Sequence, residues 1–199
     1  MTITIKKGKT FSRVLRPTAP PYIYKAITAV TKAGPVQITA PTHGLVDGQY
    51  TAVVSVEGMT QINARLDSAG LPRLGQYHKV TVVDVNTVTI NDINSSAYDT
   101  YTSGGYLQFL TPVDMASCTA RMTIKDRVGG TELVSLTTEN GGIVLDNANH
   151  TITVTISAAA TAAFTWRRGV TDLELVAADG RVTEIEPPTE VIAEDEVTT

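Results

Sequence analysis

The sequence is poor in cysteine and in charge, and each shortage excludes a class of protein. Cys118 is the single cysteine in 199 residues, which excludes an internal disulfide framework and a structural zinc site built from several cysteines. Charged residues make up 18% of the chain and the net charge is −4, so no basic field is present to hold nucleic acid. We therefore expect no nucleic-acid partner. The single cysteine also leads us to expect that the protein resides in a reducing cytosol or in a particle assembled there.

Long apolar runs are also missing. No segment approaches the roughly 20 apolar residues that a membrane-spanning helix needs. Residues 1–9 carry lysines but lack the apolar stretch of roughly 7 to 15 residues that marks a signal peptide. We expect a soluble protein that keeps its N-terminus and has no membrane partner.

What the chain does contain is short stretches that alternate β-branched and small polar residues. Thr151 to Ile156 has this pattern, and Val170 to Val176 repeats it before Asp179-Gly180, a pair that favours a tight turn. Between them Ser157 is placed to cap one helical turn over 158–163. These elements predict an all-β chain that folds as a β-sandwich or a barrel.

Turn residues separate further strand-like stretches along the chain. These stretches are two short strands within 2–15, then 26–30, 36–40, 50–56, 78–83, 87–90, 119–126, 132–136 and 142–145. The spacing between residues 22 and 110 suggests a small barrel, and residues 65–76 predict an exposed loop. Pro17, Pro20 and Pro21 predict an irregular connector before that barrel, because proline donates no hydrogen bond.

Two sets of motifs resemble known domains. The stretches 121–127, 129–131, 136–143, 152–157 and 170–175 are similar to a small immunoglobulin-like domain of tailed bacteriophages, the N-terminal domain of baseplate upper proteins. That family implies a first hairpin, here residues 2–15, running almost directly into 112–122. Roughly ninety residues intervene in this chain, which predicts a domain inserted into a surface loop.

The inserted residues have a resemblance of their own. The stretches 43–48, 56–59, 62–63, 80–90 and 102–105 are similar to the β-barrel called the first catalytic cysteine half-domain of ubiquitin-activating enzymes, copies of which occur in phage virion proteins. Cys118 lies outside this segment, so no thioester chemistry is implied. The expected fold is an immunoglobulin-like β-sandwich over 1–20 and 112–185, with a small β-barrel inserted at 22–110.

The last residues predict a flexible acidic tail. Residues 186–199 contain Pro187-Pro188, five acidic side chains and few large apolar ones, so little burial offsets the entropy of ordering them. Two roles stay open for the tail: a solubilising end, or a segment that lies along a basic neighbour in an assembly.

No catalytic, cofactor-binding or metal-binding site is predicted. His43 and Asp47 flank glycines and fit a turn better than a metal centre, which needs further ligands at defined geometry. Cys118 fits a small buried apolar residue. The serines lack a Gly-x-Ser-x-Gly setting. Glycosidases use a pair of carboxylates, but the four candidates in this chain lie beside turns and fit solvated loops better: Asp126, Glu132, Glu139 and Asp146.

Six residues are predicted to contact other proteins. Trp166, Arg167 and Arg168 have the composition of an interface anchor, with the alternative that Trp166 packs under the short helix while the arginines face water. Glu194, Asp195 and Glu196 carry the charge of the acidic tail.

The resemblances imply a non-enzymatic structural protein of a tailed-phage virion. It would act as a docking or adaptor subunit in the tail, baseplate, collar or fibre-attachment assembly. Its partners would be other virion proteins of the tail or neck and copies of itself. One alternative is a capsid decoration or head-fibre protein. Another is a module that binds a host-surface glycan, which Tyr98, Tyr101 and Tyr106 suggest.

Overall fold

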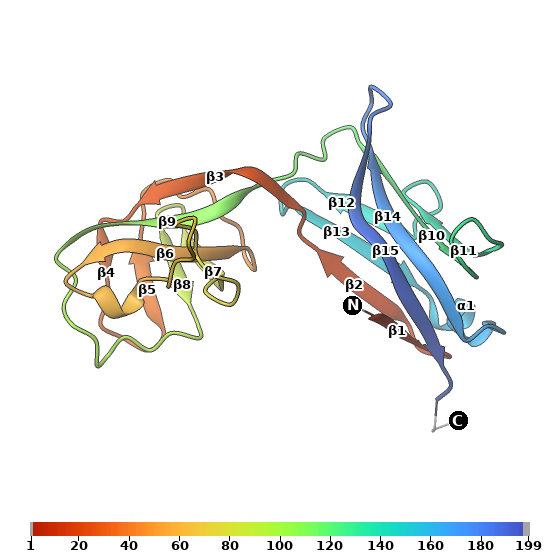
Figure 1. Cartoon of the computed structure of the whole chain (residues 1–199), viewed down its shortest axis with the longest axis horizontal. Helices are drawn as coiled ribbons and strands as arrows, with labels where there is room; N and C mark the ends of the chain where they lie inside the picture. Colours follow the sequence, from red (N-terminus) through yellow and green to blue (C-terminus); the bar gives the residue numbers. More distant parts are fainter. Residues whose placement is uncertain (1, 197–199) are drawn as a thin grey trace. The chain divides into compact units, whose positions relative to one another are not determined.

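The computed structural model describes residues 2–196 and is all-β apart from two short helical turns (Figure 1). Its internal contacts divide the chain into two compact units. Unit 1 comprises Met1–Pro17 and Val113–Thr199, and unit 2 is Thr18–Pro112. Each unit encloses its own apolar core. Within residues 2–196, no helix is long and apolar enough to cross a membrane.

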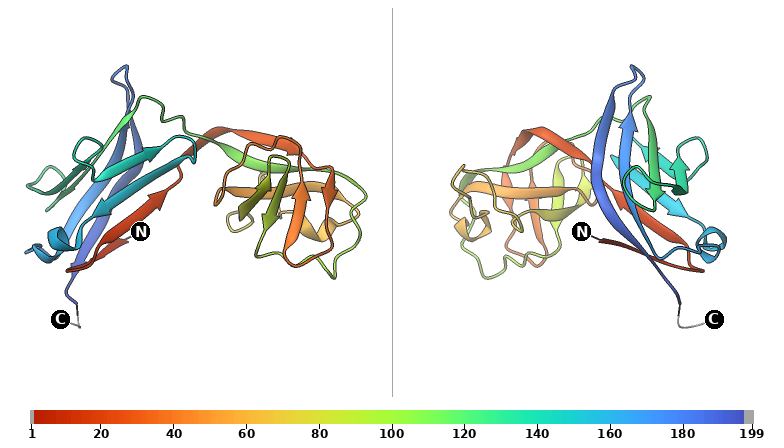
Figure 2. Two further views of the ribbon diagram at one scale, coloured as in Figure 1. Left: turned by 180° about the vertical axis from the view of Figure 1, so that it is seen from behind. Right: turned by 45° about the vertical axis from the view of Figure 1, so that its right-hand side comes forward.

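Unit 1 is a sandwich of two sheets (Figures 1 and 2). The five-stranded sheet has the order β1-β15-β14-β10-β11, and the three-stranded sheet has the order β12-β13-β2. Its elements are β1 (Thr2–Lys6), β2 (Phe11–Leu15), β10 (Thr119–Lys125), β11 (Glu132–Thr137), β12 (Ile143–Asp146), β13 (Thr151–Ile156), α1 (Ala158–Ala162), β14 (Arg168–Val176) and β15 (Val182–Glu194).

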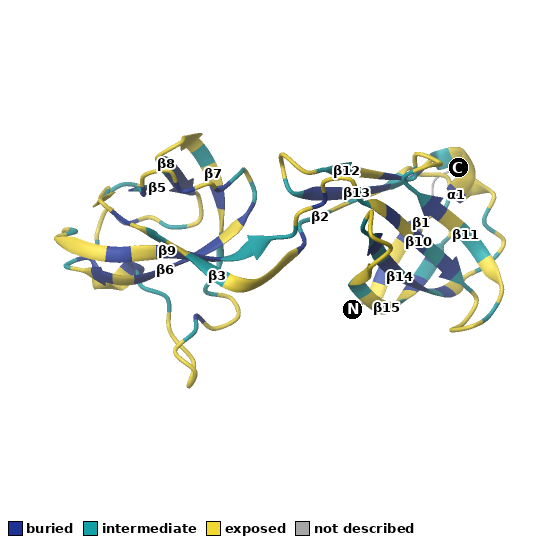
Figure 3. Ribbon diagram, turned by 90° about the horizontal axis from the view of Figure 1, so that it is seen from above, coloured by how far each residue is buried: buried dark blue, intermediate teal, exposed yellow. Residues whose placement is uncertain are grey.

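The alternating pattern of the sequence is what builds this sandwich. Along β14 every second residue is buried, and β10 alternates in the same way (Figure 3). Because side chains point to opposite faces of a strand, one face of each strand enters the core and the other stays at the surface. Ile124 and Leu173 of the larger sheet and Ile152 of the smaller one are almost fully buried in one cluster. Ser157 caps α1 as expected, accepting a hydrogen bond from the Ala160 N–H at 3.2 Å.

The first two strands do not form the expected hairpin. β1 pairs in parallel with β15, whereas β2 pairs antiparallel with β13, so the two strands enter opposite sheets. The turn between them contains Gly8 with a φ of 78°. The prediction of two strands in 2–15 is confirmed, and the prediction that they pair with each other is wrong.

The prediction of a flexible tail over 186–199 is also wrong for residues 186–194. These residues belong to β15, which pairs with β14 on one side and β1 on the other. Val191 and Ala193 are almost fully buried, and Ile185 of the same strand also packs against the core. Pro187-Pro188 lies at an irregularity in the ladder, where the missing N–H groups are tolerated. Residues 197–199 lie outside the described part of the chain.

Unit 2 is a seven-stranded sheet with the order β3-β9-β6-β7-β8-β5-β4. Its elements are β3 (Thr18–Ala26), β4 (Ala29–Val30), β5 (Val36–Thr39), β6 (Tyr50–Glu57), the 3₁₀ turn η1 (Thr60–Ile62), β7 (His78–Asp84), β8 (Thr87–Ile90) and β9 (Ser103–Pro112). Residues 65–76 form the expected loop. Pro20 and Pro21 lie within β3 instead of in an irregular connector, because β3 is an edge strand that can spare their N–H groups.

The strands of unit 2 do not close into the expected barrel. The edge strands β3 and β4 make no ladder with each other within residues 2–196. Only Ile27 and Thr28 separate them, and these two residues do not form a hairpin turn between the strands. Instead, the Ile27 N–H donates to Gly105 O of β9 at 3.0 Å and the Thr28 N–H to Thr39 O of β5 at 2.8 Å.

Candidate functional site

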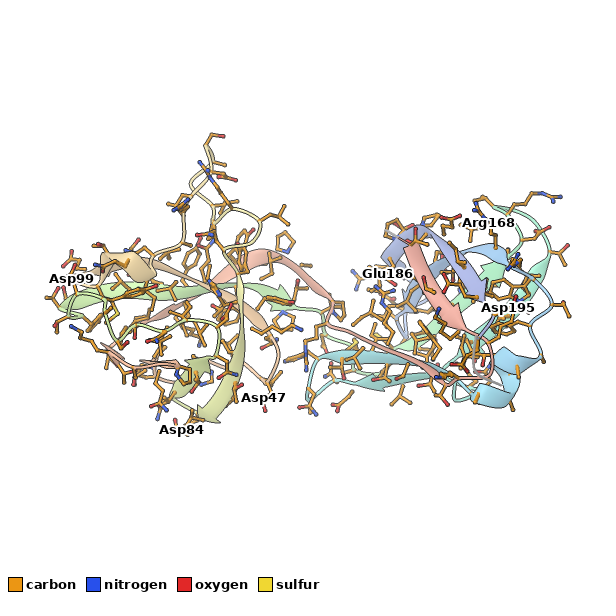
Figure 4. The ribbon with its side chains drawn as sticks, turned by 90° about the horizontal axis from the view of Figure 1, so that it is seen from below. Asp47, Asp84, Asp99, Arg168, Glu186 and Asp195 are labelled. Atoms are coloured by element: carbon orange, nitrogen blue, oxygen red, sulfur yellow. The ribbon has the colours of Figure 1, made fainter. Side chains whose placement is uncertain are left out.

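The topology of unit 1 brings five of the six predicted contact residues to one end of the sandwich. β14 runs antiparallel to β15, so the start of β14 lies beside the end of β15. β1 runs parallel to β15 and ends there too. This places Arg167 and Arg168 near the acidic residues that end β15, and Figure 4 labels Arg168 and Asp195 at this end of the unit. The sequence predicted the arginines and the acidic residues as two separate contact groups and did not show that they meet.

The acidic side chains at this end are paired within the chain. Lys7 Nζ lies 2.8 Å from Asp195 Oδ1, and Lys9 pairs with Glu196. Lys6 pairs with Glu194, its partner in the β1–β15 ladder. The hydrogen bond and charge of Lys7, with a smaller effect of Arg167, lower the pKa of Asp195. These acidic side chains are therefore paired with lysines of the same chain. Whether the tail is a solubilising end or also lies along a basic neighbour in an assembly stays a prediction.

The two arginines are the most exposed of the paired charges at this end. Their side chains are 77% and 78% exposed, and Arg167 pairs with Asp195 at 3.5 Å and Arg168 with Glu190 at 3.3 Å. Pairs of this kind contribute little to stability. The arginines line an open charged groove of about 560 Å³ together with Lys6 and Ile192–Asp195. The charged groove thus presents two guanidinium groups at the surface of unit 1.

Trp166 lies apart from the charged groove. Its ring is 4.8 Å from that of Phe164, centroid to centroid, and both pack against the core of the sandwich. The side chain is partly buried. The structure thus places Trp166 in the packing role, while the two arginines that follow it face water.

His43 holds two loops of unit 2 together. The side chain is 2% exposed; its Nδ1 accepts the Leu45 N–H at 3.0 Å, and its Nε2 donates to Asp84 O at 2.9 Å. Asp47 Oδ1 accepts the Val82 N–H at 2.6 Å, and Figure 4 labels Asp47 and Asp84 in this region. The turn-stabilising role predicted for His43 and Asp47 is confirmed.

Other chemistry-bearing side chains also serve local structure. Asp126 accepts the Thr131 N–H at 2.7 Å, and hydrogen bonds from Asn149 lower the pKa of Asp146. A backbone hydrogen bond at Glu139 lowers the pKa of that carboxyl. Cys118 is partly buried against the core of unit 1. Within residues 2–196, no three His, Cys, Asp or Glu side chains gather in a way that could hold a metal ion.

The tyrosines named from the sequence do not form a common surface. Tyr98 and Tyr101 pack against the core of unit 2, and the Tyr101 hydroxyl donates to Ile27 O at 3.0 Å. Tyr106 is 44% exposed and makes an edge-to-face contact with Tyr24. Sequence reasoning missed Tyr50 and Tyr77, which do line a hollow.

This aromatic hollow lies between β6, β7 and the end of β8. It measures about 530 Å³ and is lined by Gly48, Tyr50, Tyr77, His78, Lys79, Val80, Thr81, Asn91 and Asp92. The β7–β8 register pairs Val80 with Ile90, which sets His78 opposite Asp92. This pair could have been predicted from the sequence, because the register of the predicted hairpin 78–90 places His78 and Asp92 side by side.

Comparison with known proteins adds no family to this geometry, since no protein-family model and no curated protein matches the chain. The two resemblances stated from the sequence stay predictions that rest on the quoted motifs.

Proposed function

We propose that the chain is a non-enzymatic structural subunit of a tailed-phage virion, a docking or adaptor protein of the tail, baseplate, collar or fibre-attachment assembly. The resemblance of its motifs to phage domains motivates the proposal. The observation that carries it is the way one unit is inserted into the other.

Unit 2 leaves unit 1 and returns to it at a single place. Thr18 and Pro112, the ends of unit 2, are partners in the β3–β9 ladder. On the unit 1 side, the Val113 N–H donates to Pro17 O at 3.0 Å. An insertion with adjacent ends leaves the strands of the host domain unbroken. One unit can therefore be held by an assembly while the other is presented from it, which is what an adaptor requires.

The charged groove supports a docking role for unit 1. Arg167 and Arg168 are exposed there, and exposed ion pairs such as theirs are weak enough to be exchanged for carboxylates of another protein. Guanidinium groups pair with carboxylates in a planar, two-bond geometry. Complementary charge of this kind fixes the register and partner of an interface more than its affinity. The partner expected here is an acidic surface of a neighbouring virion protein or of another copy of the chain.

Fractionation of phage particles tests the proposal. Particles from a culture that carries the gene are purified, heads and tails are separated, and the chain is quantified in each fraction by mass spectrometry. We expect it in the tail fraction at a fixed number per particle. Its presence in heads alone would instead assign a capsid decoration or head-fibre role. Absence from particles, or substrate turnover by the purified chain, would overturn the structural role.

A matched pair of variants tests the charged groove. Arg167→Glu with Arg168→Glu reverses the two exposed charges and should reduce incorporation into particles. Arg127→Glu is the control, because Arg127 is equally exposed at 78% but lies in the turn between β10 and β11. Equal loss of incorporation in both variants would show that overall charge, and not the charged groove, matters.

A further inference from the structure

The aromatic hollow of unit 2 has features that a purely structural role does not explain. Tyr50 is 53% exposed, although it begins a strand that is otherwise largely buried. Tyr77 also lines the hollow, and its hydroxyl is buried beside the hydroxyl of Tyr22. Burial, followed by the neighbouring Tyr22 hydroxyl, raises the pKa of Tyr77. Two aromatic side chains thus border one open site.

The polar side chains of the hollow are arranged by their own hydrogen bonds. His78 Nδ1 lies 2.7 Å from Asp92 Oδ2 and Asn91 Nδ2 donates to Thr81 Oγ1 at 2.9 Å. The second ring nitrogen of His78 makes no hydrogen bond within residues 2–196. Preoriented donors and acceptors next to apolar rings are the usual lining of a small-molecule site, and the volume lies within the roughly 300–1,000 Å³ of such sites.

The charges of the aromatic hollow favour a neutral ligand. Lys79 Nζ stands 5.5 Å from the centre of the Tyr50 ring, and Asp92 carries the opposite charge. The cation and the carboxylate offset each other, so neither an anion nor a cation gains a net attraction. Asp92 is the single carboxylate among the lining residues, whereas hydrolysis of a glycosidic bond uses two. The site is thus suited to binding and not to cleavage.

We propose that the aromatic hollow binds one neutral sugar unit of a saccharide. A hexose presents an apolar face of C–H groups, which suits the rings of Tyr50 and Tyr77. Its hydroxyl groups both donate and accept, which suits Asp92, Asn91 and the free nitrogen of His78. This function goes beyond docking in an assembly, which needs no small-molecule site.

Titration of the full-length chain by NMR tests the proposal. Nitrogen-labelled protein is titrated with glucose, galactose, mannose, rhamnose and N-acetylglucosamine, each to millimolar concentration, and backbone amide shifts are followed. We expect saturable shifts confined to the amides that line the aromatic hollow for at least one sugar. A second titration with an oligosaccharide ending in that sugar distinguishes a terminal unit from a free monosaccharide as the ligand.

Two exposed tyrosines of the same unit provide matched variants. Tyr50→Ala should weaken binding by about tenfold or more, equivalent to about 1.4 kcal/mol. Asp92→Asn, at an exposed residue, should also weaken it. Tyr106→Ala should leave binding unchanged, because Tyr106 is 44% exposed but lies on β9 outside the aromatic hollow. Folding of each variant is verified by its amide spectrum.

Three results would overturn the proposal. The first is the absence of saturable shifts with every sugar, which would include the case in which the hollow takes a peptide instead. The second is a set of shifts outside the lining residues. The third is an equal loss of affinity in Tyr50→Ala and Tyr106→Ala, which would show that sugars contact tyrosines of this unit without a defined site.

Discussion

The two units use different polar interactions to hold their surfaces in place. All eight ion pairs that join Lys or Arg to a carboxylate among residues 2–196 lie in unit 1, whereas the corresponding contact in unit 2 is the hydrogen bond between His78 and Asp92. Buried polar side chains show the opposite distribution. Six of the nine belong to unit 2: His43, Gln49, Thr51, Thr89, Ser95 and Gln108.

The difference between exposed ion pairs and buried polar side chains gives the two units different properties. In unit 2 three of these buried side chains, His43, Gln49 and Ser95, bind loop backbone. For example, Gln49 Oε1 accepts the Val46 N–H at 2.9 Å and the Ser95 hydroxyl donates to Thr31 O at 2.6 Å. Such bonds are costly to break and insensitive to salt. The ion pairs of unit 1 are mostly exposed and screened by salt. Unit 1 thus has a salt-sensitive charged surface, which suits the docking role we propose, whereas unit 2 has loops held in place by buried side chains.

The largest expected effect comes from opening a cavity in one core at a time. Ile124→Ala in unit 1 and Ile90→Ala in unit 2 remove fully buried side chains, and each should lower the unfolding free energy of its own unit by about 2–5 kcal/mol. Calorimetry with hydrogen exchange would assign the transitions. If either variant lowered both transitions equally, the two cores would form one cooperative unit and the comparison would fail.

Local patterns predicted most of the strands within those two cores. β13 and β8 have the expected bounds, Thr151–Ile156 and Thr87–Ile90, because a period of two over β-branched residues is a local signal. The pairing of β1 with β15 is not local, since it joins residues at opposite ends of the chain. The acidic stretch 186–196 resembled a solvated tail because its basic partners lie far away in the sequence. Glu194, Asp195 and Glu196 pair with Lys6, Lys7 and Lys9, and Glu186 and Glu190 pair with Arg13 and Arg168.

The candidate sites were predictable only in part for the same reason. Arg167, Arg168 and the acidic end were named from composition, but their meeting depends on the β1–β15–β14 ladder. The aromatic hollow also needs β6 beside β7, where Tyr50 pairs with Lys79. A pattern within one strand does not reveal which strand lies next to it, so Tyr50 was missed.

A close backbone approach in unit 2 should give the next largest effect. Gly58 has a φ of 80°, and a Cβ there would overlap the Thr100 carbonyl. Gly70, in the same unit, has a φ of 76° with open space around it. Gly70→Ala should show conformational strain alone, about 1–2 kcal/mol, and Gly58→Ala a further ~1–3 kcal/mol from overpacking.

Urea unfolding of the two glycine variants measures the difference. A loss in Gly58→Ala no greater than that in Gly70→Ala would mean that the loop carrying Thr100 moves freely. The view of unit 2 as a unit with fixed loops would then be wrong.

One ion pair of unit 1 should behave unlike the others. Arg13 of β2 and Glu186 of β15 join the two sheets through two bonds of 2.7 and 2.5 Å, and their side chains are only 24% and 17% exposed. Glu186→Gln should cost roughly 1–3 kcal/mol, as expected for a hydrogen bond to a charged group. The control is Glu174→Gln, whose partner Arg121 is 57% exposed within one sheet; its cost should be about 1 kcal/mol or less. Similar losses in urea unfolding would show that burial of the pair adds nothing.

The smallest effect concerns pH at the charged groove. Lys7 lowers the pKa of Asp195 below its ordinary value of 3.8. A lowered folded-state pKa stabilises the fold above the unfolded value, and this contribution is lost as pH falls through the folded pKa. Carbon NMR of the Asp195 carboxyl should show its pKa rising in Lys7→Met, rising less in Arg167→Met, where the partner is 3.5 Å away, and unchanged in Lys125→Met. Equal shifts of the Asp195 pKa in all three variants would mean that the summed charge of unit 1, and not the direct bond from Lys7, lowers this pKa. The bond from Lys7 would then not be what holds the end of β15 to the start of the chain.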